Sequence, residues 1–201
     1  MLTRQKLVPI ALCLAAFSRA ARAGVLWNEV TQGDFSGDRL VPTPLILAPG
    51  DNELFGVLEG SRPSGEIDFD YFSVTVPGGF QLSALVLDFY DSTDLTAFIS
   101  IQPGPIFPND PDTVGPKDLM GWLHFGPNQV TQDLLPAMSA NGYGFTTPLP
   151  QGTYSFWCQQ LDDYTDWTGR FVVTPVPGPA SLAALLVPPF LMRRRRTPSG
   201  R

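Results

Sequence analysis

Hydrophobic and polar residues alternate with a period of two along the middle of this chain. The alternation is clearest at 72–76, 95–101 and 154–159, where apolar side chains occupy every second position. Because a β-strand points successive side chains to opposite faces, each run predicts a strand with one face turned inward. The segment 82–89 differs, since it is apolar on both faces at 84–87, and this predicts a central strand between two layers.

Turn-forming residues separate these runs. Proline, glycine, asparagine, glutamine or aspartate gather at 49–52, 77–79, 150–152 and 162–163. Two longer segments, 102–117 and 128–144, are predicted to be irregular, the first as a long surface loop. We find no convincing helical period between residues 24 and 175, so the sequence predicts an all-β fold. Several short strands with such turns favour one jelly-roll-like β-sandwich over a closed barrel.

The amino terminus has the pattern of a secretory signal peptide. Arg4 and Lys6 precede an apolar core at 7–17, and residues 21–23 have the small-x-small form of a cleavage site. The apolar core is far shorter than the roughly 20 residues of a membrane-spanning helix. Residues 1–23 are therefore predicted to be removed, and the folded domain is expected to begin at residue 24.

The carboxyl terminus, residues 176–201, combines three parts in a fixed order. A short motif is followed by an apolar run at 180–192, predicted to be a hydrophobic helix, and then by four arginines. Arginines resist transfer through a bilayer and stay on its cytoplasmic side, so the order indicates a chain that pauses in a membrane. The motif residues are Val176, Pro177, Gly178 and Pro179, and the basic stop is Arg193, Arg194, Arg195 and Arg196.

This tail resembles that of the PEP-CTERM proteins, exported bacterial proteins with a Val-Pro-Glu-Pro motif, a membrane segment and an arginine cluster. Here Gly178 stands in place of the family's glutamate. The resemblance implies transient anchoring in the inner membrane and cutting by an exosortase-like sorting protease. It also implies a final place at the cell surface or in the extracellular matrix, in association with exopolysaccharide or biofilm. The alternative is an ordinary stop-transfer helix.

Two motifs in the middle of the chain carry a second resemblance. Residues 68–79 resemble the Asp-x-Asp-Tyr-Phe strand of bacterial pre-peptidase C-terminal domains, and residues 149–154 resemble their Leu-Pro-x-Gly-Thr-Tyr segment. The resemblance covers about residues 50 to 175. It implies a small β-sandwich, and some members of that family bind calcium or polysaccharide.

The charge of residues 24–175 limits the partners of the domain. This segment holds all 19 acidic residues and only four cations, Arg39, Arg62, Lys117 and Arg170, so its formal charge is −15. Such a field repels nucleic acid and attracts cations. After signal removal Cys158 is the only cysteine, so no intramolecular disulfide is available. About 150 residues are enough to bury the core of one domain.

Calcium is the cofactor that the acidic residues suggest, because hard cations prefer several oxygen ligands. The clusters are Asp34 with Asp38, Asp68 with Asp70, Asp91 with Asp94, Asn109 with Asp110 and Asp112, and Asp162 with Asp163 and Asp166. None completes an EF-hand loop. A structural calcium site is predicted at Asp68 and Asp70, where the resembled family's strand begins. The alternative is that these carboxylates only keep an exported protein soluble.

Catalysis has little support in the sequence. His124 is the only histidine, and the chain has no Gly-x-Ser-x-Gly motif, so a hydrolase is the weakest alternative. Aromatic side chains can stack on sugar rings, and strand parity places Trp157 opposite the inward residues of its strand, either exposed or under a second layer. We therefore expect an exported, non-enzymatic surface protein, with a carbohydrate-binding module as the alternative.

Overall fold

The computed structural model describes residues 24–61, 63–161 and 164–178. The predicted signal peptide lies outside these residues, and so do Pro179, the apolar run and the arginine cluster. In the described part of the chain, no helix has the length and apolar character needed to cross a membrane.

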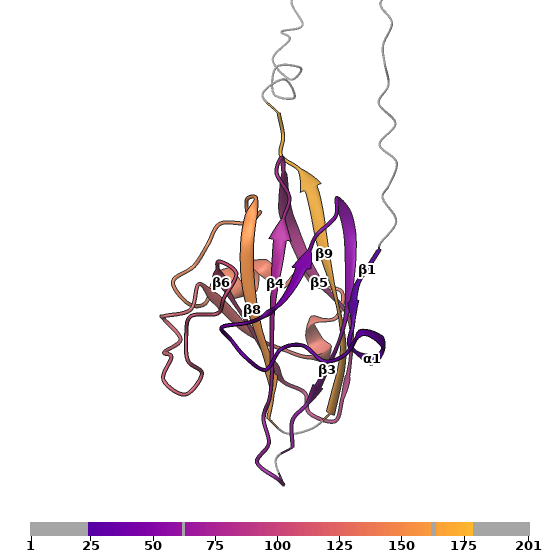
Figure 1. Cartoon of the computed structure of the whole chain (residues 1–201), viewed down its shortest axis with the longest axis vertical. Coiled ribbons are helices and arrows are strands. Elements are labelled where there is room, and N and C mark those ends of the chain that lie inside the picture. The colour runs from indigo at the N-terminus through magenta and orange to yellow at the C-terminus, as the bar shows by residue number, and fades with distance from the viewer. Residues whose placement is uncertain (1–23, 62, 162–163, 179–201) are drawn as a thin grey trace, which may run out of the picture.

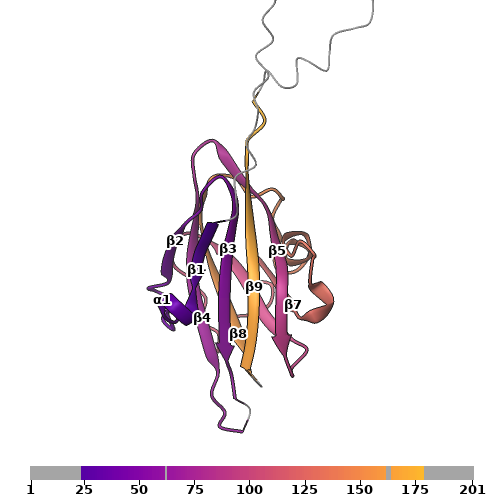
Figure 2. The same cartoon turned by 90° about the vertical axis from the view of Figure 1, so that its right-hand side faces the viewer.

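The described residues form two β-sheets (Figures 1 and 2), so the prediction of an all-β fold is confirmed. The first sheet has the order β1 (Gly24–Asn28), β3 (Gly50–Glu59), β9 (Tyr164–Pro175), β5 (Phe80–Ser92). The second has the order β2 (Thr43–Ile46), β4 (Asp68–Val76), β8 (Gly152–Gln160), β6 (Ala97–Pro103), β7 (Gly121–Phe125). The helical elements are short: α1 (Glu29–Gln32), η1 (Pro127–Gln129) and α2 (Leu135–Ser139).

The three alternating runs of the sequence correspond to β4, β6 and β8, the three central strands of the second sheet. The inward residues of these strands are buried, but Leu95 at the start of the run 95–101 lies before β6 and is exposed. The edge strands β1 and β2 pair in parallel with β3 and β4. The predicted turn at 49–52 is wrong at its end, because β3 already begins at Gly50. Gly50 has a positive φ of 96° that turns the chain, and the side chain of Asn52 bonds to the backbone of Ala48.

The prediction that 82–89 is a central strand is also wrong, because β5 lies at the edge of the first sheet. Its free edge is covered by residues 131–134 and by Leu149. The segment 128–144, predicted to be irregular, also contains the short helix α2. Leu134 donates its N–H to the carbonyl of Leu85 at 2.8 Å, and Leu82 and Leu149 exchange backbone hydrogen bonds. These bonds satisfy backbone groups that an edge strand would otherwise leave free.

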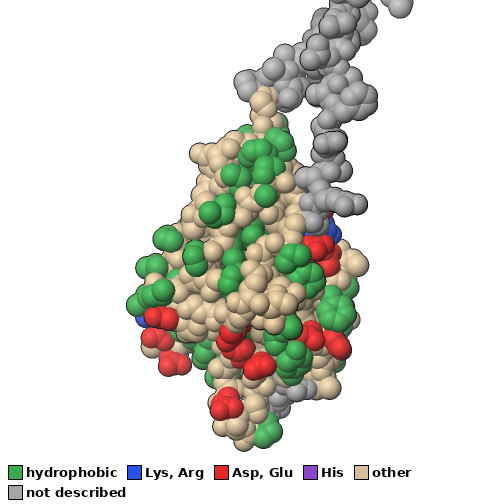
Figure 3. All heavy atoms as spheres, turned by 45° about the vertical axis from the view of Figure 1, so that its right-hand side comes forward, with side chains coloured by type: hydrophobic (Ala, Val, Ile, Leu, Met, Phe, Trp, Pro, Cys, Tyr) green, Lys and Arg blue, Asp and Glu red, His purple; other side chains and the backbone are tan. Residues whose placement is uncertain are grey.

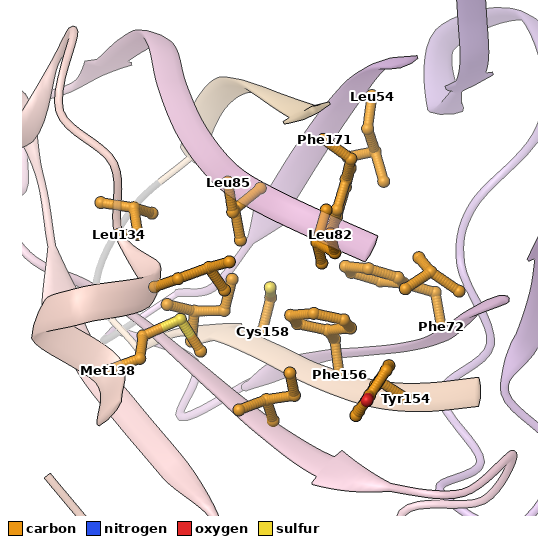
Figure 4. Close-up of a cluster of buried hydrophobic side chains, with 14 of the residues drawn as sticks. Leu54, Phe72, Leu82, Leu85, Leu134, Met138, Tyr154, Phe156, Cys158 and Phe171 are labelled. Atoms are coloured by element: carbon orange, nitrogen blue, oxygen red, sulfur yellow. The ribbon is translucent and has the colours of Figure 1, made fainter. Parts of the chain in front are cut away.

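The two sheets contribute to one hydrophobic core (Figure 4). The rings of Phe72 in β4 and Phe156 in β8 stack with centroids 5.2 Å apart, and Phe171 of β9 meets both edge-on. Cys158 is fully buried beside them, as its place in the alternating run predicted. Truncating such a phenylalanine to alanine costs about 3–5 kcal/mol, so these rings dominate the packing between the sheets.

The predicted surface loop at 102–117 begins two residues later than expected, because Gln102 and Pro103 are the last residues of β6. The rest of this segment contains no strand and, with the residues up to 120, covers part of the outer face of the second sheet. Phe107 and Leu119 of this segment are buried against Tyr71 of β4 and Trp157 of β8. Trp157 therefore lies under a second layer and is only 4% exposed.

The start of β1 and the end of β9 lie toward the same end of the domain (Figures 1 and 2). Gly24 pairs with Asn52, which pairs with Phe171 near the end of β9. The connection from β3 to β4 lies at the opposite end. Most acidic side chains on the face in Figure 3 lie in the half nearer that opposite end.

Candidate functional site

Three carboxylates from distant parts of the sequence meet beside α1. Glu29, Asp34 and Asp70 each present an oxygen, and these oxygens lie within 4.8 Å of one another. Glu29 is the first residue of α1, Asp34 follows that helix, and Asp70 is in β4. We call these three residues the acidic cluster.

Glu29 is held in place by two backbone hydrogen bonds. Its Oε1 accepts the N–H of Phe35 at 2.8 Å, and its Oε2 accepts the N–H of Val57 in β3 at 2.5 Å. The residue is 7% exposed, and burial raises the pKa of its carboxyl group above the ordinary range. Glu29 thus connects the cluster to the first sheet.

Asp34 is exposed, but the residues after it fix its position. Phe35 is buried and its ring lies 4.8 Å from that of Phe72 in the core. Ser36 accepts the N–H of Tyr71 in β4 at 2.8 Å. The segment that carries Asp34 is therefore anchored in the core and to the strand of Asp70.

Asp70 is the unusual member of the cluster. It is 0% exposed, and neither carboxylate oxygen has a hydrogen-bond partner among the described residues. Burial raises the pKa of Asp70 far above its ordinary range, and the negative charges of Glu29 and Asp68 raise it further. A buried charge without a partner is costly, because several kcal/mol of hydration are lost.

The sequence prediction paired Asp70 with Asp68, and the structure gives Asp68 a different contact. Its Oδ2 accepts the N–H of Glu59 in β3 at 2.7 Å, and burial raises its pKa. Asp38, which the sequence grouped with Asp34, accepts the N–H of Leu40 in a turn. Glu29 was missed, because no acidic neighbour in the sequence marks it.

A hollow of about 230 Å³ opens beside the acidic cluster. Its lining residues are Glu29, Val30, Asp34, Val57, Glu59 and Tyr164. Solvent can therefore reach two of the three carboxylates, and the arrangement can take up a cation with its remaining water ligands.

A second candidate surface is aromatic and lies on the outer face of the second sheet. The ring of Trp122 stacks on that of Phe98 at 6.3 Å, and His124 meets both rings edge-on at 5.6 Å. These rings and Trp157 line a hollow of about 200 Å³ together with Pro111, Val114, Pro116 and Leu119. Trp157 itself is covered, so the accessible rings are its neighbours.

The remaining predicted residues have simple surroundings. His124 is exposed on β7, and its ring neighbours are Phe98 and Trp122 rather than a serine and a carboxylate. Burial raises the pKa of the Cys158 thiol well above its ordinary value, which disfavours a reactive thiolate. Val176, Pro177 and Gly178 are exposed and have no regular secondary structure.

Comparison of the chain with protein-family models, with curated proteins and with solved structures finds no match.

Proposed function

We propose that this protein is an exported, non-enzymatic β-sandwich of jelly-roll type that acts at the cell surface or in the extracellular matrix. A PEP-CTERM-like tail would hold it transiently at the inner membrane until an exosortase-like protease cuts it. The observation that carries the proposal is that β1 begins and β9 ends toward the same end of the domain. Leader and tail would both face the membrane from that end, and the rest of the domain would point away.

The surroundings of the sorting motif support access by a protease. Val176 donates its N–H to the carbonyl of Gly79 at 2.9 Å, which fixes the chain where β9 ends. Val176 is still 50% exposed, and the two residues after it are exposed as well. A protease could therefore bind the motif as an extended segment without unfolding β9.

Mass spectrometry of the mature protein tests the proposal. The full chain is expressed in a bacterium that has an exosortase and in the same strain without it. We expect the mature protein to lack residues 1–23 and to end near 176–179. Replacing both Pro177 and Pro179 with alanine should leave the precursor in the membrane, whereas Pro198→Ala, beyond the arginines, should have no effect. Intact Arg193–Arg196 on the mature surface protein would contradict the proposal.

Carbohydrate binding is the second candidate function, and the grouped rings of Phe98, Trp122 and His124 favour it. Flat apolar faces with polar edges suit sugar rings. The strongly acidic domain would repel an anionic polymer, so a neutral polysaccharide fits best.

Affinity electrophoresis in gels that contain hydroxyethyl cellulose or a neutral β-glucan tests this second function. We expect the wild-type protein to be retarded, and Trp122→Ala and His124→Ala each to weaken binding by about tenfold, which is about 1.4 kcal/mol. Phe89→Ala removes an exposed ring from the other sheet and is the matched control. Equal retardation of all variants, or none of the wild type, would reject carbohydrate binding by this surface.

A further inference from the structure

The acidic cluster brings together carboxylates that are attached to the two different sheets. Glu29 is bonded to β3 of the first sheet, and Asp70 belongs to β4 of the second. Asp34 lies on the connecting segment, which Ser36 attaches to β4. A ligand held by all three residues would therefore bridge the sheets and secure the segment 29–36 between them.

Among the residues that the structure describes, none of the charges that act most on Asp70 is positive. These charges belong to Glu29, Asp68, Asp34 and Glu59. Arg170 pairs with Asp88 and Asp51, and Arg39 lies near Asp110. Hydrogen bonds from Phe35 and Val57 satisfy Glu29 in part, but the two oxygens of Asp70 receive none from the described residues.

We infer that Glu29, Asp34 and Asp70 form a calcium site, in which the ion receives the unpartnered oxygens of Asp70 and bridges the two sheets. This inference is independent of the sorting proposal. Three carboxylates supply up to six oxygens, and water in the adjacent hollow can complete the six to eight ligands that calcium takes. Each oxygen of Glu29 keeps a second lone pair for the ion beside its backbone hydrogen bond.

The oxygens of the cluster lie within 4.8 Å of one another. Calcium–oxygen distances of 2.3–2.6 Å place opposite ligands up to about 5 Å apart, so one calcium ion can contact all three carboxylates. Calcium also accepts irregular arrangements of oxygen ligands, whereas magnesium demands near-ideal octahedral geometry. Zinc prefers nitrogen and sulfur ligands, and this cluster offers only oxygens.

Thermal unfolding of the full chain in mild detergent, with EDTA or with 0.01–10 mM calcium chloride, tests the inference. A ligand that binds only the folded state stabilises it by mass action, so calcium at about 100 times its Kd should raise Tm by roughly 5–10 °C. Isothermal titration with calcium alone should give one site per chain. Sodium chloride at matched ionic strength measures the contribution of screening.

Variants distinguish this cluster from the general charge of the domain. Asp34→Asn and Asp70→Asn should each abolish the calcium shift, and Asp34→Asn should fold normally because its side chain is exposed. Asp112→Asn removes the same charge from an exposed loop and should keep the full shift. Asp68→Asn should keep most of it, since Asp68 is bonded to Glu59 instead.

Three outcomes would overturn the inference. The first is coincident melting curves with calcium and EDTA, and the second is a shift that sodium chloride reproduces. The third is a calcium shift that survives both Asp34→Asn and Asp70→Asn. An equal response to magnesium would overturn the assignment to calcium. If Asp70→Asn stabilises the protein equally with and without calcium, Asp70 is a neutral acid that binds no metal.

Discussion

At the scale of single residues, the buried carboxyl group of Asp70 has the most unfavourable electrostatic surroundings in the described part of the chain. Its carboxyl group lies in the interior next to three other carboxylates, Glu29, Asp34 and Asp68, and Glu59 also faces it. In the metal-free protein such a group binds its proton more tightly when folded than when unfolded. The free energy of unfolding then depends on pH in a direction opposite to that of a salt-bridged aspartate.

The first residue-scale prediction concerns this pH dependence in EDTA. The pKa values of Glu29, Asp68 and Asp70 are all raised in the folded state, so the folded protein holds more protons than the unfolded chain above the ordinary carboxyl pKa of about 4. Stability from these groups is present below that pH and is lost as pH rises toward the raised values. Tm in EDTA should therefore be higher at pH 5 than at pH 8.

Calcium and one substitution serve as the checks. Saturating calcium should remove most of the difference in Tm between pH 5 and pH 8, because the bound ion replaces the protons on these carboxyl groups. In EDTA, Asp70→Asn should reduce the difference in Tm between pH 5 and pH 8 and should raise Tm at pH 8. Asp112→Asn should leave that difference in Tm unchanged. A Tm in EDTA that stays level or increases from pH 5 to pH 8 would contradict this account.

At the scale of secondary-structure elements, the covered edge of β5 is the feature with a stability consequence. An uncovered edge strand presents free N–H and C=O groups to other chains. Asp133 covers part of it: its Oδ1 accepts the N–H of Leu85 at 3.0 Å and that of Leu135 at 3.1 Å. The side chain of Asp133 thus accepts hydrogen bonds from both the edge of β5 and the start of α2.

Replacement of Asp133 by alanine should leave the N–H of Leu85 without a partner. The expected cost is about 1–3 kcal/mol, or a fall in Tm of roughly 2–4 °C for each kcal/mol. Asp133→Asn keeps an oxygen in the same place and should lose much less. Differential scanning calorimetry measures both values, and light scattering on heating should show earlier aggregation for the alanine variant. Equal Tm values for the two variants would rule out this role of the side chain.

Elements differ in how well the sequence predicts them, and side-chain volume explains the difference. In β4, β6 and β8 the inward positions are large and apolar, so the period of two is visible. In β3 and β9 the inward positions include Gly56 and Gly169, which interrupt the pattern. A Cβ atom on Gly56 would lie 2.3 Å from Nε1 of Trp167, so the indole ring fills the space that two side chains would otherwise occupy. The sequence pattern does not show this, because the ring of Trp167 occupies the space beside Gly56 only in the folded protein.

The candidate site likewise depends on contacts that the sequence pattern does not show. Asp70 was predicted as a ligand from a local motif, but its neighbours Glu29 and Asp34 reach it only because β1 pairs with β3 and Ser36 bonds to Tyr71. Trp157 was placed on the correct face by strand parity. Its burial depends on Phe107, which comes from a loop whose path no local pattern specifies.

At the scale of the whole molecule, the proposed sorting motif and the two candidate binding surfaces lie at different places on the domain. The exposed residues of the proposed sorting motif, Val176 to Gly178, follow the end of β9. The acidic cluster lies beside α1, and the aromatic surface lies on β6 and β7 of the second sheet. Cutting at the motif would therefore leave both candidate binding surfaces intact.

The strand order of the first sheet has a consequence for the timing of folding. β9, the last strand of the domain, lies between β3 and β5 and pairs with both. A chain that crosses a membrane amino terminus first, as we propose, cannot complete this sheet until residues 164–175 have emerged. Pairing between strands distant in sequence is also slow, on the order of milliseconds to seconds. The topology therefore delays completion of the first sheet during transport. The domain reaches its final fold only after β9 has crossed the membrane.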